Sequence, residues 1–149
     1  MEDEILEDDP QRVALEEVIH ILTPLREHRQ TSAERRQRQA EDELRRDREC
    51  LAKARTAWID ERERQHEQRE ALAVEHVNQA LKLTDVDRWH DRERSLLDQL
   101  SRLRQSIQQQ TQAVEQQQQA LQQAKQDAKA ALRAVEKLAC LAEAINDES

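Results

Sequence analysis

Apolar residues recur every seven positions along the second half of the chain. They form two tracks, the second lying three residues after the first, and each track holds nine positions. The first track reads Val86, Glu93, Leu100, Ile107, Val114, Leu121, Ala128, Val135 and Ala142; the second reads Trp89, Leu96, Leu103, Gln110, Gln117, Ala124, Ala131, Leu138 and Ile145. Two such tracks are typical of a helix that supercoils along a second helix. The pattern therefore predicts one long helix over 86–145.

The glutamine-rich stretch at 105–128 belongs to this helix. By composition alone it resembles a low-complexity tract, which would be disordered or prone to β-aggregation. Ile107, Val114, Leu121 and Ala128 nevertheless follow one another at intervals of seven residues within it. We therefore expect a helix that carries most of its glutamines on the solvent side.

The first half of the chain carries a thinner version of the same pattern. Leu44, Leu51, Trp58 and Leu72 lie on one seven-residue track, which Gln65 interrupts. A companion track contains Ala33, Ala40 and Ala54 and is broken by Asp47 and Glu61. Because both tracks persist, we expect a second long helix whose contact face is poor in large apolar residues.

Helix-start signals divide the chain. Asp9 and Pro10 fit an N-cap followed by the first helical position. Thr23-Pro24 predicts a kink or a fresh start capped by Thr23, and Thr84 or Asp85 is a candidate cap for the second helix. The expected segments are an acidic disordered tail at 1–9, a helical segment at 10–23, a first arm at 24–83, a corner at about 84–87, a second arm at 86–145 and a disordered tail at 146–149.

The two arms have nearly equal lengths, since Pro24 lies 60 residues before Thr84 and Ile145 lies 61 after it. Equal arms predict a hairpin about 90 Å long at 1.5 Å per residue. Residues should then pair where their numbers add to about 169, which brings together Leu72 with Leu97, Trp58 with Val114, and Leu51 with Leu121. The predicted fold class is therefore all-α: a long antiparallel two-helix coiled-coil hairpin with a kinked N-terminal helical segment.

Composition supports extended helices over a packed globule. Glycine is absent, aromatic residues make up 1% and charged residues 38% of the chain, and mean hydropathy is -1.08. So little apolar material predicts a flexible protein that a partner makes firmer. The net charge of -8 comes from acids near the two ends. The mixed-sign remainder, without a basic face or interleaved aromatics, argues against nucleic-acid binding.

The expected cellular location of the protein follows from the absence of a long apolar segment in its sequence. The first residues are acidic, and no apolar run approaches signal-peptide or membrane-spanning length. We expect a cytoplasmic protein that meets a membrane only through partners. Cys50 and Cys140 are far apart in the sequence and are expected to be free thiols.

The sequence offers little catalytic chemistry. Without glycine there is no phosphate-binding loop or nucleophile elbow. Glu-x-x-His occurs at Glu17/His20 and Glu63/His66, a spacing that di-iron bundles use, but the apolar track places Glu63 and His66 on the outer face of their helix. The arginine-rich stretch at 34–49 is interspersed with acids and reads as a solvated, salt-bridged face. We expect no enzyme activity, cofactor or metal site.

The assembled features resemble a known family. Two helical arms, a central corner, an Arg/Glu-rich first arm and the sequence "LQQAKQDAKAALRAVEKL" at 121–138 resemble the central stalk proteins of bacterial type III secretion. This is the YscO/HrpO group, related to the flagellar export protein FliJ. The resemblance runs from about Leu25 to Leu141 and implies a non-enzymatic hairpin in the pore of the hexameric secretion ATPase. Its implied partners are that ATPase, the export gate protein and export chaperones.

The resemblance gives the two ends of the hairpin different roles. Apolar residues at the terminal end would contact the ATPase, and those at the corner would contact the gate. The expected ATPase-side residues are Val13, Ile19, Ile21, Leu22, Leu138 and Ile145, and the expected tip residues are Val77, Leu81 and Trp89. For Trp58 we expect packing between the helices, and for Trp89 either closure of the end of the seam or partner contact.

A second interpretation stays open. The chain could be a structural scaffold or adaptor that dimerises in parallel through 86–145, with no corner at Thr84. The Thr-Asp-Val-Asp interruption between arms of equal length opposes it.

Overall fold

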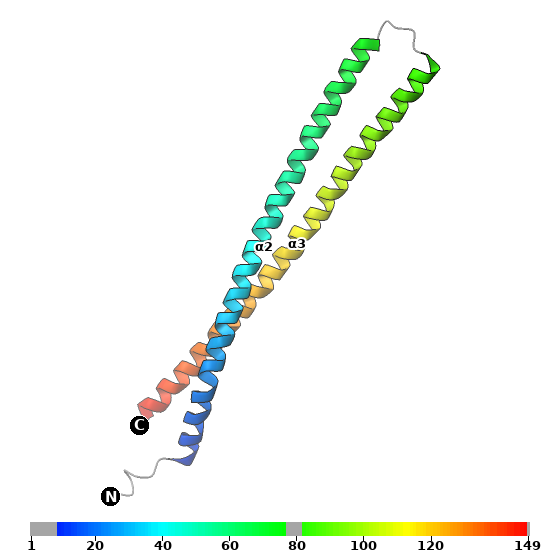
Figure 1. The fold of residues 1–149 in the computed structure, drawn as a ribbon. Helices are drawn as coiled ribbons and strands as arrows, with labels where there is room; N and C mark the ends of the chain where they lie inside the picture. Colours follow the sequence, from blue (N-terminus) through cyan, green and yellow to red (C-terminus); the bar gives the residue numbers. More distant parts are fainter. Residues whose placement is uncertain (1–8, 77–81, 149) are drawn as a thin grey trace, which may run out of the picture. The chain divides into compact units, whose positions relative to one another are not determined.

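The computed structural model describes residues 9–76 and 82–148 and contains two α-helices within them, α2 (Pro10–His76) and α3 (Leu83–Glu148) (Figure 1). No strand occurs in these two ranges. The chain divides into a terminal unit, Met1–Asp42 with Gln119–Ser149, and an inner unit, Glu43–Gln118. In each unit a segment of α2 packs against a segment of α3, which confirms an all-α fold of two long helices.

The start of α2 follows the predicted capping pattern. The Oδ1 atom of Asp9 accepts a hydrogen bond from the backbone N–H of Gln11 at 3.1 Å, and the carbonyl of Asp9 accepts one from Val13 at 3.0 Å. Pro10 occupies the first helical position, where a missing N–H costs nothing. The cap therefore holds the helix start where the sequence predicted it.

Helix α2 continues through Pro24 without a break. A fresh start at this point is therefore wrong. Thr23 does not act as a cap, because its Oγ1 donates to the carbonyl of Ile19 at 2.7 Å. Proline removes one helical hydrogen bond, but the residues on both sides of Pro24 belong to the same helix. The kink at Pro24 stays a prediction.

The predicted corner at 84–87 is helical in the structure. The carbonyl of Lys82 accepts hydrogen bonds from the backbone N–H groups of Asp85 at 2.9 Å and Val86 at 3.2 Å, so Lys82 holds the cap position. Thr84 and Asp85 then lie in the first turn of α3, where an acidic residue is favoured by the helix dipole. An acidic residue in the sequence indicates that a helix starts nearby, but the predicted position of that start can be wrong by a few residues. At its other end α3 extends to Glu148, three residues beyond the predicted end at 145.

Burial confirms the two faces that pack together. Every position of the two α3 tracks is buried or half-buried except Trp89, which is 37% exposed. The α2 tracks show the same burial, including Gln65 and the half-buried Asp47 and Glu61. We call these four tracks the seam. Its buried apolar residues are Ala33, Leu44, Leu51, Leu96, Val114, Ala128, Leu138 and Ile145.

Hydrogen bonds between the helices define the register. The bonded pairs are Arg26 with Ala134 in the terminal unit, and Gln65 with Leu96, Arg69 with Glu93 and Glu43 with Gln117 in the inner unit. The residue numbers of these pairs add to 160, 161, 162 and 160, which makes the segments antiparallel. The predicted value of about 169 is wrong. The difference is close to one heptad, so the same faces meet while each residue lies beside a different partner.

The observed register explains the two glutamines of the α3 tracks. With numbers adding to 161, Gln110 is level with Leu51 and Gln117 is level with Leu44. The Nε2 atom of Gln117 donates to Glu43 at 2.8 Å, so its polar end leaves the seam while its methylene groups stay in it. Leucines of α2 thus lie opposite the two polar positions of the α3 tracks.

Candidate partner-binding surfaces

Among the described residues of the inner unit, one polar side chain is fully buried. Gln65 is 0% exposed, and its Nε2 donates to the carbonyl of Leu96 at 3.0 Å and to Oε1 of Glu61 at 3.2 Å. Its Oε1 atom has no hydrogen-bond partner among the described residues. A buried acceptor without a partner costs free energy. The bond from Gln65 to Leu96 therefore fixes how α2 and α3 align, while the unpaired oxygen lowers stability.

Glu61 anchors the neighbouring polar cluster. Two short hydrogen bonds, at 2.6 and 2.7 Å, join Nη2 of Arg64 to the two carboxylate oxygens of Glu61. These bonds, followed by the one from Gln65, lower the pKa of Glu61 below its ordinary value of 4.5. The same pairing raises the pKa of Arg64. The cluster therefore keeps its charges at physiological pH.

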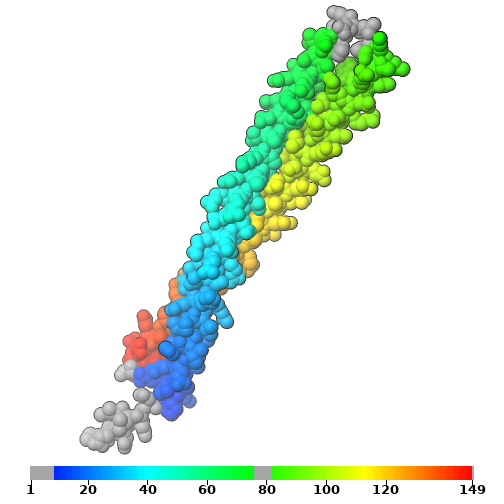
Figure 2. Space-filling view, viewed as in Figure 1, coloured from blue at the N-terminus to red at the C-terminus, as the bar shows by residue number. Residues whose placement is uncertain are grey.

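A groove of about 780 Å³ lies between α2 and α3 in the inner unit. Its apolar part consists of the half-buried Trp58 and Leu100 together with Ile59 and Leu97, which are 49% and 55% exposed. The remaining lining residues are charged or polar: Arg62, Glu63, His66, Glu67, Arg69, Ser101 and Arg104. The space-filling view shows the two inner-unit segments in contact along their length (Figure 2). Trp58 and Leu100 belong to the seam, so the groove borders it.

The terminal unit also has a groove, of about 580 Å³, and its lining is cationic. Arg26 and Arg29 of α2 face Arg133 and Lys137 of α3 across a floor of alanines. Nη1 of Arg26 donates to the carbonyl of Ala134 at 2.9 Å, which fixes one of the four cations. The sequence analysis did not find this cluster, because its members come from segments more than 100 residues apart.

The beginning of α2 carries an apolar face directed away from the seam. Val18, Ile21 and Leu25 recur at helical spacing and are 47%, 61% and 50% exposed. Their exposure contrasts with that of Ile19, which is half-buried and lies two heptads before the seam residue Ala33. These exposed apolar side chains form a candidate surface for a partner.

The predicted ATPase-side residues fall into two groups. Val13 and Ile21 are exposed, at 39% and 61%, and Leu22 is half-buried. Leu138 and Ile145 are 5% and 6% exposed, because the seam encloses them. In this arrangement those two side chains pack between the helices of the terminal unit, which leaves the α2 residues to form an outer surface.

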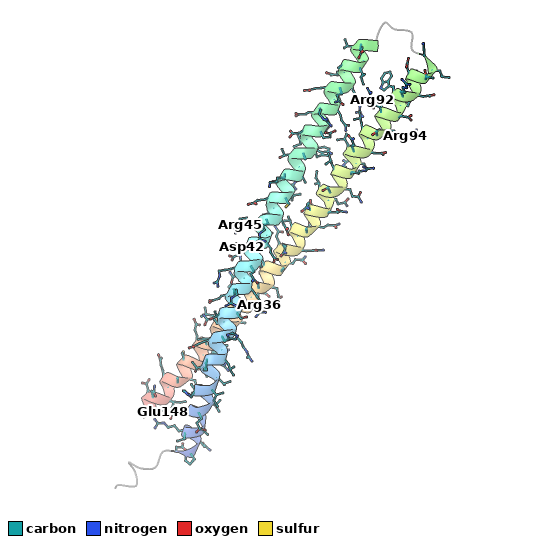
Figure 3. All side chains as sticks on the ribbon, viewed as in Figure 1. Arg36, Asp42, Arg45, Arg92, Arg94 and Glu148 are labelled. Atoms are coloured by element: carbon teal, nitrogen blue, oxygen red, sulfur yellow. The ribbon has the colours of Figure 1, made fainter. Side chains whose placement is uncertain are left out.

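Of the predicted tip residues, only Trp89 can be placed. Val77 and Leu81 lie outside the described residues. Trp89 is 37% exposed and, in the observed register, is level with Leu72 at the end of the described seam. The surrounding stretch of α3 is rich in arginine, with Arg92 and Arg94 projecting nearby (Figure 3).

Candidate chemistry is sparse in the described part of the chain. No group of three or more metal-ligating side chains forms there. His66 of the Glu63/His66 motif pairs instead with Glu70, at 3.1 Å, on the helix surface. Cys50 and Cys140 are free, as predicted, and both are exposed. None of the described helices has an apolar stretch long enough to span a membrane.

Comparison with known proteins identified no relative: no family model, no curated protein and no solved structure matches this chain.

Proposed function

We propose that this chain is a central stalk of a bacterial type III secretion ATPase complex, a non-enzymatic coiled-coil hairpin that couples the hexameric ATPase to the export gate in the cytoplasm. The observation that carries the proposal is that helices of 67 and 66 residues pair in antiparallel fashion in each unit, along seam positions that recur every seven residues. A stalk inside a sixfold pore requires length and a mixed-charge surface. It does not require a fixed reaction centre.

The exposed apolar stripe at the start of α2 supports an ATPase-side contact. Ile21 belongs to that stripe, Val13 is exposed in the same segment of α2, and Ile19 and Leu22 are half-buried. Leu138 and Ile145 contribute by holding the end of α3 against α2. Trp89 remains the proposed contact to the gate, together with Val77 and Leu81. Export chaperones are further proposed partners.

The scaffold interpretation requires α3 to dimerise in parallel through 86–145. The residues that such a dimer would use are the same seam residues that lie against α2, among them Leu96, Val114 and Leu138. A dimer of this kind would have to separate the two helices first. The antiparallel pairing therefore favours the stalk.

The test combines binding with catalysis. The chain is mixed with the cognate hexameric ATPase, retained complexes are measured, and ATP turnover is measured with and without the chain. We expect retention and faster turnover. Ile21→Asp should weaken both, whereas Ile59→Asp, which changes a similarly exposed isoleucine of the inner unit, should leave both unchanged. Absence of binding together with unchanged turnover would contradict the proposal.

The gate contact needs a separate test. We expect Trp89→Ala to reduce binding to the purified gate protein and to reduce secretion, while binding to the ATPase is retained. Unchanged gate binding would remove the tip assignment alone.

A further inference from the structure

The cationic groove of the terminal unit has no acidic residue in its lining. It is lined by Arg26, Arg29, Arg133 and Lys137 over three alanines. None of these four cations forms an ion pair with another described residue. On α3, Asp127 lies one turn before the alanine floor, outside the lining, and accepts a hydrogen bond from Gln123 at 3.0 Å. The charge of the groove is therefore positive and has no counter-charge among the described residues.

An exposed apolar surface adjoins this groove. Leu25, the last residue of the exposed stripe on α2, precedes Arg29 by four residues, so the two side chains lie on the same face of the helix. On α3, Leu141 is 42% exposed and follows Lys137 by the same interval. Glu17 lies about three turns before Arg29, so it borders only the far end of the stripe. The surface thus has apolar residues nearer the start of α2 and cations further along.

The sequence that directly precedes α2 has the complementary composition. It reads "MEDEILEDD" at 1–9, with six acidic residues and one apolar pair, Ile5 and Leu6, between them. Residues 1–8 lie outside the described residues, and Asp9 caps α2. Because this acidic segment is covalently joined to the terminal unit, its effective concentration at a surface within its reach is on the order of 1 mM.

The position of the apolar pair within the segment matches the apolar stripe. An extended chain covers about 3.3 Å per residue, and an α-helix rises about 1.5 Å per residue. Ile5 precedes Asp9 by four residues and can therefore reach about 13 Å from it. Val18 follows Asp9 by nine residues, which is also about 13 Å along α2. A segment that folds back along the helix would bring the apolar pair level with the stripe.

The first acidic residues match the cationic groove in the same way. Glu2 can reach about 23 Å from Asp9. In the register of the terminal unit Lys137 is level with Thr23, which lies about 21 Å from Asp9 along α2. Arg29 begins about 30 Å from Asp9, but side chains on a helix lean toward its N-terminus by about one turn. Both cations are therefore within reach of the carboxylates at 2–4.

We propose that the acidic segment folds back along α2 and occupies this surface, with its apolar pair on the stripe and the carboxylates of residues 2–4 beside Lys137 and Arg29. A docked segment covers Ile21, which belongs to the proposed ATPase contact, and so holds that contact closed until the segment is displaced. This regulatory consequence rests on the proposed function. The docking itself does not.

Docking is tested by a spin-label distance within one chain. The full chain carries Cys50→Ser and Cys140→Ser, with nitroxides on Asp3→Cys and Arg36→Cys; Arg36 is exposed and lies outside the groove lining. The docked segment places residue 3 about 20 Å from residue 36, whereas a segment pointing away from α2 places it up to about 60 Å away. We expect a narrow distance distribution near the shorter value.

Charge reversal identifies the contacts. Arg29→Glu with Lys137→Glu should convert the narrow distribution into a broad one at longer distances, and adding Glu2→Lys with Glu4→Lys should restore it. The matched control is Arg35→Glu with Lys129→Glu, which makes the same change in net charge at exposed positions of the terminal unit outside the groove. The control should keep the narrow distribution.

Three results would overturn the docking. One is a broad distribution in the chain with all native charges. Another is a narrow distribution that Arg29→Glu with Lys137→Glu leaves unchanged, because the cations would then have no role. The third is a short distance that disappears when labelled chain is diluted with unlabelled chain, because the segment would then occupy a second copy.

The regulatory consequence has its own readout. Glu2→Lys with Glu4→Lys releases the segment, so we expect this variant to retain more of the cognate ATPase than the native chain does at equal concentration. Equal retention would overturn the masking of Ile21. If no variant binds the ATPase, the proposed function fails, and the spin-label distances still decide whether the segment docks.

Discussion

The seam of the terminal unit and the seam of the inner unit follow the same seven-residue repeat but contain different side chains. In the terminal unit the seam contains a layer of two small side chains, because Ala33 is level with Ala128 in the observed register. In the inner unit Trp58 is level with Leu103, and the fully buried Gln65 is level with Leu96. Interaxial distance depends on the side chains at the contact. Small residues thus favour close approach, whereas the larger residues of the inner unit leave the flanking groove that Ile59 and Leu97 border.

The difference teaches that one heptad pattern can provide two kinds of surface. The terminal unit exposes apolar residues of α2 at Val18, Ile21 and Leu25, in addition to those that its seam buries, such as Leu138 and Ile145. The inner unit keeps its apolar groups next to the seam and surrounds them with arginines. The following substitutions test this comparison, from the largest expected effect to the smallest.

Leu96 and Leu97 are adjacent leucines with opposite environments, at 9% and 55% exposure. We expect Leu96→Ala to lower the free energy of unfolding by about 3 kcal/mol, because it removes buried methyl groups and leaves a cavity. Leu97→Ala should change it by less than about 0.5 kcal/mol. Urea unfolding followed by far-UV circular dichroism measures both. Equal losses would mean that the seam does not bury Leu96 selectively.

Ala33 tests the narrow seam of the terminal unit, where it is 3% exposed. We expect Ala33→Leu to destabilise the chain by about 2 kcal/mol through overpacking. The control Ala120→Leu places the same side chain on an exposed position of α3 and should be neutral within about 0.5 kcal/mol. The same urea experiment applies. A stabilising Ala33→Leu would show that this seam has room for larger residues.

Gln65 tests the polar layer of the inner unit. Replacing it by leucine removes the buried Oε1 that lacks a partner, so we expect Gln65→Leu to stabilise the chain by about 1 kcal/mol. Gln68→Leu, at an exposed position three residues later, serves as the control and should have little effect. A clear loss of stability in Gln65→Leu alone would show that the hydrogen bond to Leu96 contributes more than the unpaired oxygen costs.

The smallest expected effect is a pH dependence at Glu61. Its pKa is lowered below 4.5 by the hydrogen bonds from Arg64 and Gln65, so its contribution to stability is present above that pH and is lost as the pH falls through the lowered pKa. The melting temperature of wild type should therefore exceed that of Glu61→Gln at pH 7, and the difference should shrink as the pH is lowered below 4.5. A difference that grows on acidification would contradict this sign.

The sequence predicted which faces meet but not which residues lie side by side. The tracks through Leu51, Val114 and Leu138 are buried as expected. The register was wrong by nearly a heptad, because sliding one helix by seven residues brings an equivalent face to the same place. Specific polar partners decide between such registers, and the bond from Gln65 to Leu96 could not be read from spacing alone.

The candidate surfaces were predicted only in part. Of the exposed residues at the start of α2, Val13 and Ile21 were expected as contact residues from the family resemblance, whereas Val18, Leu25 and the two grooves were not. Each groove joins flanking positions of both helices, such as Arg62 with Arg104 or Arg29 with Lys137, and those pairs become neighbours only once the register is known. An error of one heptad in the register is enough to hide them.

The most direct test of the antiparallel register is a pair of engineered disulfides in a chain carrying Cys50→Ser and Cys140→Ser. Ala54→Cys with Ile107→Cys joins seam positions whose numbers add to 161, and Ala54→Cys with Val114→Cys joins positions one heptad further apart. Because a disulfide requires Cα atoms within about 7 Å, mild oxidation at low protein concentration should link 54 with 107 inside one chain and leave 54 and 114 as thiols. Preferential linkage of 54 with 114, or linkage only between chains, would contradict the structure described above.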